Sequence, residues 1–252
     1  MRVECKTWTE LGLVVLSALF VCGCFSDNET PSPYPSCTDV FNQYASKYFG
    51  EVGIPTVERQ WGQDKDKRPG FLMSFDESSA CELSEEDVRV LCDTVGDTLV
   101  YQACRPLMPN GLSFGYIKSL DITCDKEFDG KHPARSSLGD LFSVSFPDAY
   151  SFIKSGYRVP SSGAYADRYE GVDYVGCQYG DCLGVSGFAV YTDTVASVDW
   201  ERFGLLPFSF KFELLGLPQK AGDYTFRVLY TKSDGTSGAV QLDPVSLEAA
   251  KQ

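Results

Sequence analysis

The amino-acid sequence predicts a mainly β protein, an antiparallel, immunoglobulin-like β-sandwich with a few short helices. Two segments near the C-terminal end, 207–214 and 224–230, alternate apolar and polar residues, and this period of two places the apolar side chains on one face of a strand. An apolar strand face has to be covered by a second layer, and a second sheet provides one. The apolar positions are Phe208, Phe210, Phe212 and Leu214 in the first segment and Tyr224, Phe226, Val228 and Tyr230 in the second.

Turn-forming residues separate these strands. Leu-Pro-Gln-Lys-Ala-Gly-Asp at 217–223 and Ser-Asp-Gly-Thr at 233–236 are typical of tight connections, and Ala-Val-Gln-Leu at 239–242 leads into a last strand. We therefore expect an antiparallel meander of three strands. The strand-like segments 117–123 and 187–192 are expected to supply part of the second layer.

Three segments favour short helices. Residues 39–49 place apolar and aromatic side chains at helical spacing before Gly50, although the aromatic content would also suit a strand. Ser84 precedes three acidic residues in a capping pattern, ahead of an apolar group that includes Leu91. Residues 147–156 have a proline at a first turn and a glycine beyond the end.

The N-terminal end predicts a signal peptide of the lipoprotein kind. The apolar run 11–23 has the length of a signal-peptide core and is too short to span a bilayer, and Arg2 and Lys6 supply a positively charged start. Gly23 directly before Cys24 resembles the lipobox of bacterial lipoproteins. In that family the signal is cut before the cysteine, which then carries fatty acids such as palmitate. The alternatives are an ordinary secretory signal or a buried apolar helix with a chance cysteine.

The resulting organisation has three parts, namely a signal peptide over residues 1–23, a tether over 24–36 and one β-sandwich-type domain over 37–252. The tether is short, polar and rich in proline, so its backbone stays extended and solvated. Its acidic residues Asp27 and Glu29 resemble the export tag that places lipoproteins of Bacteroidetes on the outside of the outer membrane.

The acidic composition excludes several partners. With a net charge of −13 and a pI near 4.5, the chain lacks the basic face that nucleic acid or anionic lipid headgroups require. Membrane attachment is therefore expected to come from the acyl chains on Cys24, where each buried CH₂ contributes about 0.8 kcal/mol. No cofactor and no metal is predicted.

Seven cysteines follow Cys24 in the chain. An exported chain meets an oxidising compartment where cysteines often pair, and an odd number leaves at least one free or bonded to another molecule. Cys177 and Cys182 are the first candidates for a disulfide, because together they would close a short loop. The alternative is that several cysteines are small buried hydrophobic residues.

Catalytic motifs are weak in this sequence. His132 is the only histidine, so a serine or cysteine hydrolase would need it as its base, and Phe188 replaces the second glycine of a nucleophile elbow around Ser186. Residues 125–130 copy the first half of an EF-hand loop, but Ser136 stands where calcium would need a glutamate. We therefore expect no enzymatic activity. The alternative is a secreted hydrolase that uses two carboxylates, such as a glycosidase, although sequence spacing favours no particular pair.

A glycine-rich stretch over 157–191 carries the candidate ligand-binding residues. Rigid aromatic rings on such loops make stacking surfaces for sugars or proteins at little entropic cost. The alternative is that the tyrosines cap the ends of the sandwich with their hydroxyls in water. The aromatic residues in question are Tyr165, Tyr169, Tyr174 and Tyr179, with Trp200 beyond the stretch.

Residues 122–142 contain a strand, an Asp-rich turn, His-Pro-Ala-Arg and then Ser-Leu-Gly-Asp-Leu-Phe. This segment resembles a sequence motif of uncharacterised Bacteroidetes surface lipoproteins with a domain of unknown function. That motif has glycine at the position of Arg135 and asparagine at the position of Gly139. The ending at 222–231 is similar as well. The resemblance implies a surface lipoprotein with an unassigned domain, and it supplies no catalytic residues. Our leading hypothesis is a lipid-anchored outer-membrane protein with a binding or structural role, whose ligand is a glycan or a protein.

The physical reason for this motif is expected to be structural. A strand leaves the sheet and turns at Asp129 and Gly130. Three apolar residues then bring the chain back to the core, namely Leu138, Leu141 and Phe142.

Overall fold

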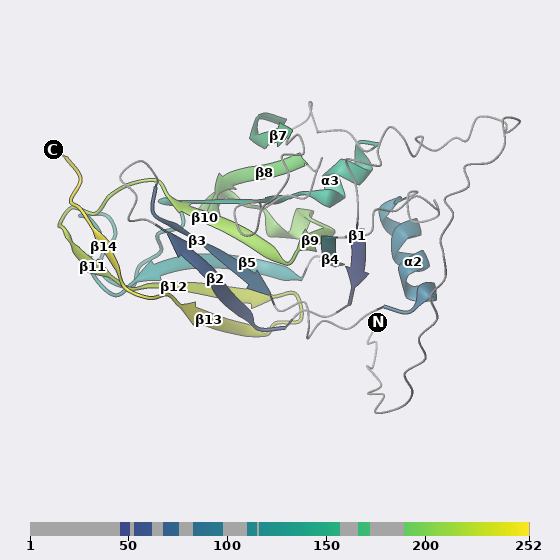
Figure 1. Cartoon of the computed structure of the whole chain (residues 1–252), viewed down its shortest axis with the longest axis horizontal. Helices are drawn as coiled ribbons and strands as arrows, with labels where there is room; N and C mark the ends of the chain where they lie inside the picture. The colour runs from purple at the N-terminus through teal and green to yellow at the C-terminus, as the bar shows by residue number, and fades with distance from the viewer. Residues whose placement is uncertain are drawn as a thin grey trace, which may run out of the picture.

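The protein is mainly β, and its two largest sheets are antiparallel. The structure, a computed structural model, describes residues 46–50, 53–61, 68–75, 83–97, 110–114, 116–156, 166–171 and 189–251. The larger sheet has six strands (Figure 1). In spatial order they are β2 (Pro55–Trp61), β3 (Gly70–Phe75), β10 (Ser209–Leu214), β6 (Phe142–Pro147), β8 (Ala189–Thr194) and β7 (Tyr169–Gly171).

A three-stranded sheet forms the second layer. Its strands are β13 (Ser237–Gln241), β12 (Phe226–Lys232) and β5 (Ile117–Cys124), in that order. A short sheet at one end includes the parallel pair β1–β4, and a two-stranded ribbon lies at the other end. These are β1 (Ser46–Phe49), β4 (Asn110–Phe114) and β9 (Leu205–Pro207), and β11 (Gly222–Tyr224) with β14 (Val245–Leu247).

The main core lies between the six-stranded and the three-stranded sheet. Phe142 on β6 meets Phe226 on β12 edge-to-face with ring centroids 5.3 Å apart. Phe75 on β3 meets Tyr230 on β12 in the same way at 6.0 Å. Because aromatic rings from both sheets interlock in one cluster, the predicted mainly β, sandwich-like architecture is confirmed.

The predicted alternation is confirmed, and so is the antiparallel pairing of the last two predicted strands, β12 and β13, but the meander is wrong for its first strand, β10. The apolar residues of β10 and β12 are buried and face the core. However, β10 pairs with β3 and β6, whereas β12 pairs with β5 and β13. The chain between β10 and β12 therefore crosses from one sheet to the other, and the apolar faces of the two strands pack toward the same core. The alternation of apolar and polar residues indicates which side chains share a face of a strand, but it does not indicate which strand pairs with it.

The expected strands over 117–123 and 187–192 are present as β5 and β8. β5 supplies part of the second layer, as expected, whereas β8 belongs to the six-stranded sheet. β5 hydrogen-bonds to β12, and β8 hydrogen-bonds to β6 and β7.

Two of the three predicted helices are present. α2 (Glu85–Val95) is capped by Ser84, whose Oγ accepts a hydrogen bond from Asp87 N at 3.2 Å. α3 (Ala149–Lys154) is capped by Asp148, because Pro147 is still the last residue of β6. The helix expected over 39–49 is wrong for its described part, since 46–49 form β1, as their aromatic content allowed.

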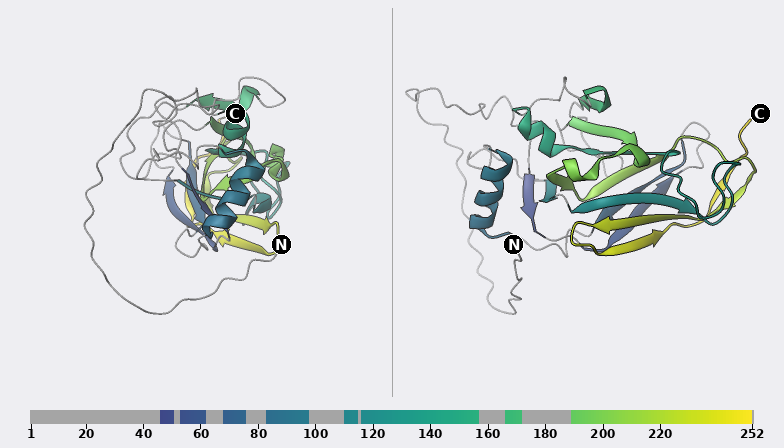
Figure 2. Two further views of the ribbon diagram at one scale, coloured as in Figure 1. Left: turned by 90° about the vertical axis from the view of Figure 1, so that its right-hand side faces the viewer. Right: turned by 180° about the vertical axis from the view of Figure 1, so that it is seen from behind.

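The helices lie at one end of the sandwich, opposite the β11–β14 ribbon (Figure 2). Short 3₁₀ helices at Ala166–Arg168, Val195–Ser197 and Trp200–Arg202 accompany the six-stranded sheet. No helix in the described ranges is long and apolar enough to cross a membrane. A second, smaller core joins α2, α3 and β9 and consists of Leu91, Cys92, Val95, Ala149, Phe152, Ile153 and Leu205.

Gly238→Ala is expected to destabilise the fold by about 1–2 kcal/mol. A Cβ at Gly238 would overlap the hydroxyl and ring of Tyr230, which is packed in the core. Gly130→Ala is the matched control, because a Cβ at Gly130 has nothing within 4 Å. Urea unfolding measures both variants, and equal stabilities would contradict the expected overlap.

Candidate functional site

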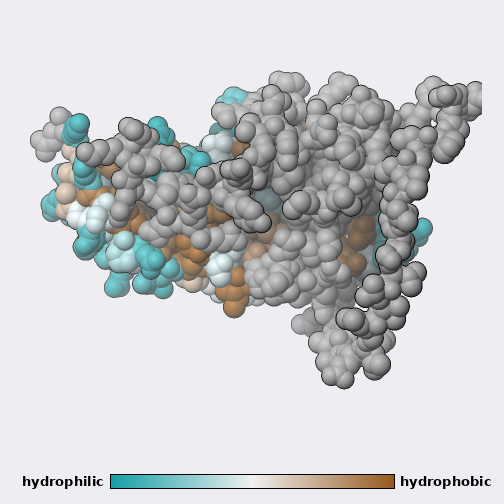
Figure 3. All heavy atoms as spheres, in the orientation of Figure 1, coloured by the Kyte–Doolittle hydropathy of each residue, from teal (hydrophilic) through white to brown (hydrophobic). Residues whose placement is uncertain are grey.

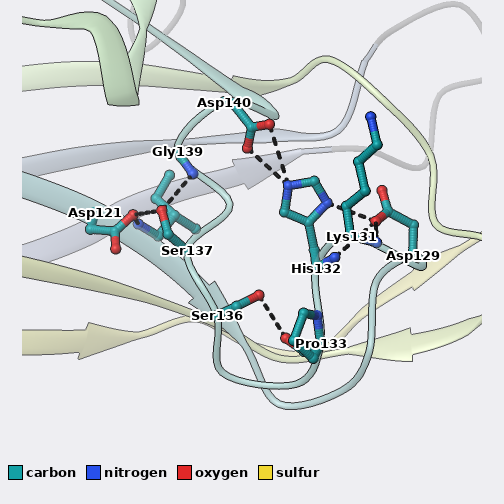
Figure 4. A network of polar contacts seen from close by, with 10 residues as sticks. Asp121, Asp129, Lys131, His132, Pro133, Ser136, Ser137, Gly139 and Asp140 are labelled. Carbon is teal, nitrogen blue, oxygen red and sulfur yellow. Dashed lines mark hydrogen bonds and ion pairs between the residues drawn. The ribbon is translucent and has the colours of Figure 1, made fainter.

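The segment between β5 and β6 forms a polar turn around the single histidine of the chain (Figure 4). His132 N donates to Asp129 O at 3.1 Å, and Phe128 N donates to His132 O at 2.9 Å. These two bonds close a tight loop at Asp129 and Gly130, where the sequence predicted the chain to turn. The side chain of His132 is only 11% exposed.

Each ring nitrogen of His132 faces a carboxylate. Nδ1 lies 2.7 Å from Asp129 Oδ1, and Nε2 lies 3.1 Å from Asp140 Oδ1. An ionised carboxylate only accepts hydrogen bonds, so the doubly protonated ring donates to both partners, whereas a neutral ring donates to one of them. We call this cluster of Asp129, His132 and Asp140 the histidine clamp.

Asp129 also accepts hydrogen bonds from the backbone. Its Oδ1 receives Lys131 N at 2.8 Å and His132 N at 3.0 Å. Loss of solvent raises the pKa of the Asp129 carboxyl, but these two N–H donors and the His132 ring together hold that pKa below its ordinary value. The ionised form of Asp129 is therefore the form that the fold selects.

Acidification is expected to weaken the fold through Asp129. A folded-state pKa below the unfolded value contributes stability that is present above the unfolded pKa of about 3.9 and is lost as the pH falls through the folded pKa. Urea unfolding of the wild type and of Asp129→Asn, at about pH 7 and about pH 3, measures this loss. The wild type should lose more stability than the variant, and equal losses would contradict the stabilising role of the carboxylate.

The chain between His132 and Asp140 lies along the edge of β5 that does not pair with β12. Arg135 N donates to Cys124 O at 2.8 Å, and Leu138 N donates to Ile122 O at 2.7 Å. Ser137 Oγ donates to Asp121 Oδ1 at 2.6 Å, which fastens the same segment to the strand (Figure 4). This segment, residues 133–138, therefore covers the Ile122–Cys124 end of the outer edge of β5.

The predicted return of the chain to the core is confirmed. Leu138 and Phe142 are buried, and Leu141 packs against the core from its margin. Arg135 has a φ of 67°, in the left-handed region that glycine adopts at little cost. That conformation gives a physical reason for a glycine at this place in the resembling motif.

The geometry of the clamp suits a structural role better than catalysis. Both ring nitrogens of His132 contact carboxylates, which leaves neither to activate a nucleophile. The neighbouring hydroxyl of Ser136 donates to Pro133 O at 2.7 Å. The cluster therefore joins the turn at Asp129 to the start of the returning chain at Asp140.

The EF-hand-like segment 125–130 does not form a cation cage. Asp125 Oδ1 accepts Thr225 N at 2.9 Å and so caps the chain before β12, while Asp129 belongs to the clamp. Among the residues that the structure describes, no three His, Cys, Asp or Glu side chains are grouped so that they could hold a metal ion.

Two of the five residues predicted to form an aromatic surface, Tyr169 and Trp200, lie among the described residues. Trp200 is a correction: its ring is 4% exposed and stacks on Phe146 at 5.6 Å, so it belongs to the core and offers no face to a ligand. Tyr169 begins β7, opposite Tyr191 on β8. The other three candidates lie outside the described residues, namely Tyr165, Tyr174 and Tyr179.

The two cysteines that the structure describes are small buried residues, in agreement with the alternative to disulfide formation. Cys92 and Cys124 are both buried. Cys124 Sγ donates to Lys126 O at 2.8 Å, and burial raises the pKa of its thiol. Cys24 and the proposed pair Cys177 and Cys182 lie outside the described residues.

Asp140 is the functional residue that sequence reasoning missed. It lies eight positions after His132, on the far side of a turn, and its carboxylate comes to 3.1 Å from the ring. The only sequence feature that could have indicated it is that Asp129, His132 and Asp140 all belong to the segment that resembles the lipoprotein motif. That feature pointed to a turn without indicating which side chains meet.

Fold and site together define a mainly β, sandwich-like protein whose single histidine is held between two carboxylates. Comparison of the chain with protein-family models, with curated proteins and with solved structures found no match.

Proposed function

We propose that this chain is a lipid-anchored outer-membrane protein, displayed at the cell surface, with a binding or structural role rather than an enzymatic one. The observation that carries the proposal is the apolar run 11–23 ending in Gly23 and Cys24. A proline-rich tether over 24–36 then separates the lipid from the folded domain. The resemblance of residues 122–142 to surface lipoproteins of Bacteroidetes supports the same function.

The packing of the domain supports a binding or structural role. Its core is filled with interlocking aromatic rings, and its single histidine is occupied by Asp129 and Asp140. The proposed ligand is a glycan or a protein, recognised by tyrosines of the glycine-rich stretch 157–191. The disulfide between Cys177 and Cys182, which would stiffen that stretch, is part of the proposal.

Cys24→Ala is expected to release the protein from membranes. The acyl chains on Cys24 are the proposed attachment, so their loss should lower the membrane-bound fraction at least about tenfold. Cys22→Ala is the matched control, because Cys22 lies in the same apolar run without the preceding glycine. Sedimentation of membranes followed by immunoblotting measures both variants, and mass spectrometry of the wild type identifies the modified residue.

Two results would overturn the anchor. One is unchanged sedimentation of Cys24→Ala with membranes, and the other is an unmodified first residue in mature protein from the native host. A glycan array then separates the binding role from the hydrolase alternative. Binding without turnover supports the proposal, whereas released reducing ends would replace it with a glycosidase.

A further inference from the structure

In the described part of the chain, the sheet of β13, β12 and β5 has one partly covered edge and one edge without a further strand. Residues 133–138 cover the Ile122–Cys124 end of β5 through the hydrogen bonds of Arg135 and Leu138. At the opposite edge lies β13, whose only strand partner in the described part of the chain is β12. The surface over these strands mixes hydrophilic and hydrophobic residues (Figure 3).

The hydrogen bonds at the two ends of the β12–β13 ladder show which groups of β13 point outward. Lys232 N donates to Thr236 O at 2.8 Å, and Leu242 N donates to Phe226 O at 2.9 Å. In an antiparallel pair, bonded and non-bonded positions alternate, so the even-numbered residues of β13 bond to β12. The N–H and C=O groups of the odd-numbered residues point away from the sheet, and these residues are Ser237, Ala239 and Gln241.

Within the described residues, β13 itself carries none of the charged side chains, prolines or bulges that usually prevent strand pairing. Natural edges are protected by charged side chains, proline, bulges or a covering segment. The sequence of β13 is Ser-Gly-Ala-Val-Gln, and its register with β12 is uninterrupted. Ser237, Ala239 and Gln241 are exposed. An open, uncharged and regular edge is suited to accept another strand.

We propose that two copies of this chain associate through β13, antiparallel and with Ala239 opposite Ala239 of the second copy. This register places Ser237 opposite Gln241, so every outward N–H and C=O group of these three residues receives a partner. The pairing joins two three-stranded sheets into one continuous sheet with a two-fold axis at Ala239.

A second copy fits this edge because the register is self-complementary. The chain carries a net charge of −13, yet β13 itself contributes no charge, so no like charges meet within the paired strands. The nearest carboxylates also avoid each other, since Asp243 would lie opposite Gly235 and Asp234 opposite Pro244. On the outer face, Leu229 lies beside Ala239 and is 37% exposed, so two copies would form a continuous apolar row.

Charge substitutions at Ala239 test this association. In Ala239→Asp and in Ala239→Lys, like charges meet at the two-fold axis, and the dimer dissociation constant should rise at least about tenfold. Mixing the two variants places opposite charges together and should restore association. Ser119→Asp and Ser119→Lys are the matched controls, because Ser119 is exposed on β5 of the same sheet. Sedimentation velocity of the full chain in density-matched detergent measures all five proteins and the mixture.

Circular dichroism and the urea midpoint verify that each variant is folded. A dimer that weakens with either charge at 239, recovers in the mixture and is unchanged by the Ser119 variants supports the inference. A wild-type chain that stays monomeric at about 100 µM, far above the Kd of a specific complex, would overturn it. A dimer that is indifferent to both charges at 239 would overturn it as well. None of these results depends on whether Cys24 carries lipid.

Discussion

Phe146→Ala is expected to lower the free energy of unfolding by about 3–5 kcal/mol, the largest effect of any single substitution that we predict. Phe146 on β6 is completely buried. Its ring contacts four other aromatic rings, with centroids 5.0 to 5.6 Å away. Truncation leaves a cavity that neighbouring rings cannot fill without leaving their own contacts. These neighbours are Tyr191, Trp200, Phe203 and Phe210.

Urea unfolding followed by tryptophan fluorescence measures the effect, because Trp200 stacks directly on Phe146. Val90→Ala is the control. Val90 is 52% exposed on α2, so its truncation should change the stability by less than about 0.5 kcal/mol. A loss below about 1 kcal/mol for Phe146→Ala would contradict the central place of this ring in the core.

His132→Ala is expected to lower the free energy of unfolding by about 2–3 kcal/mol at neutral pH. The substitution removes the ring that lies between Asp129 and Asp140, so both contacts of the ring with these carboxylates are lost, and a hydrogen bond to a carboxylate is charge-assisted. The returning chain then loses its side-chain connection to the turn. The effect is smaller than that of Phe146→Ala, because the Asp140 side chain is 63% exposed and water replaces part of the lost interaction.

Lys131→Ala is the control for the histidine clamp. Lys131 lies in the same turn and is exposed, while its backbone N–H bond to Asp129 survives the substitution. Hydrogen exchange adds a local measurement, since the amides of Arg135 and Leu138 should exchange faster in His132→Ala. A variant with wild-type stability and unchanged exchange would show that the clamp does not hold the segment.

The turn and its return to the core are the part of the site that the sequence predicted best. Gly130 follows Asp129 at a turn, and the apolar residues Leu138 and Phe142 had to be buried. The partner of His132 could not be predicted, because several acidic residues lie within reach along the chain. Only the folded backbone brings Asp140 to the ring.

The strands were predictable for a different reason than their pairing. The period of two in β10 and β12 is a local property, so the sequence indicates which side chains are buried. Which strand lies beside which depends on contacts between distant segments. For example, β10 pairs with β3, more than a hundred residues earlier in the chain.

The sequence by itself therefore determined the alternating burial of β10 and β12, the N-terminal cap of α2 and the acidic character, because these are properties of composition or of neighbouring residues. It also carries the proposed lipid attachment at Cys24. Only the tertiary structure decided that β10 and β12 lie in opposite sheets, that Trp200 is a core residue and that β13 forms an open edge. The burial of Trp200 depends on packing against rings such as Phe146 from distant parts of the chain. The strand order depends on backbone hydrogen bonds between distant segments, and because every residue except proline can donate and accept such bonds, the residue types do not specify the partner strand.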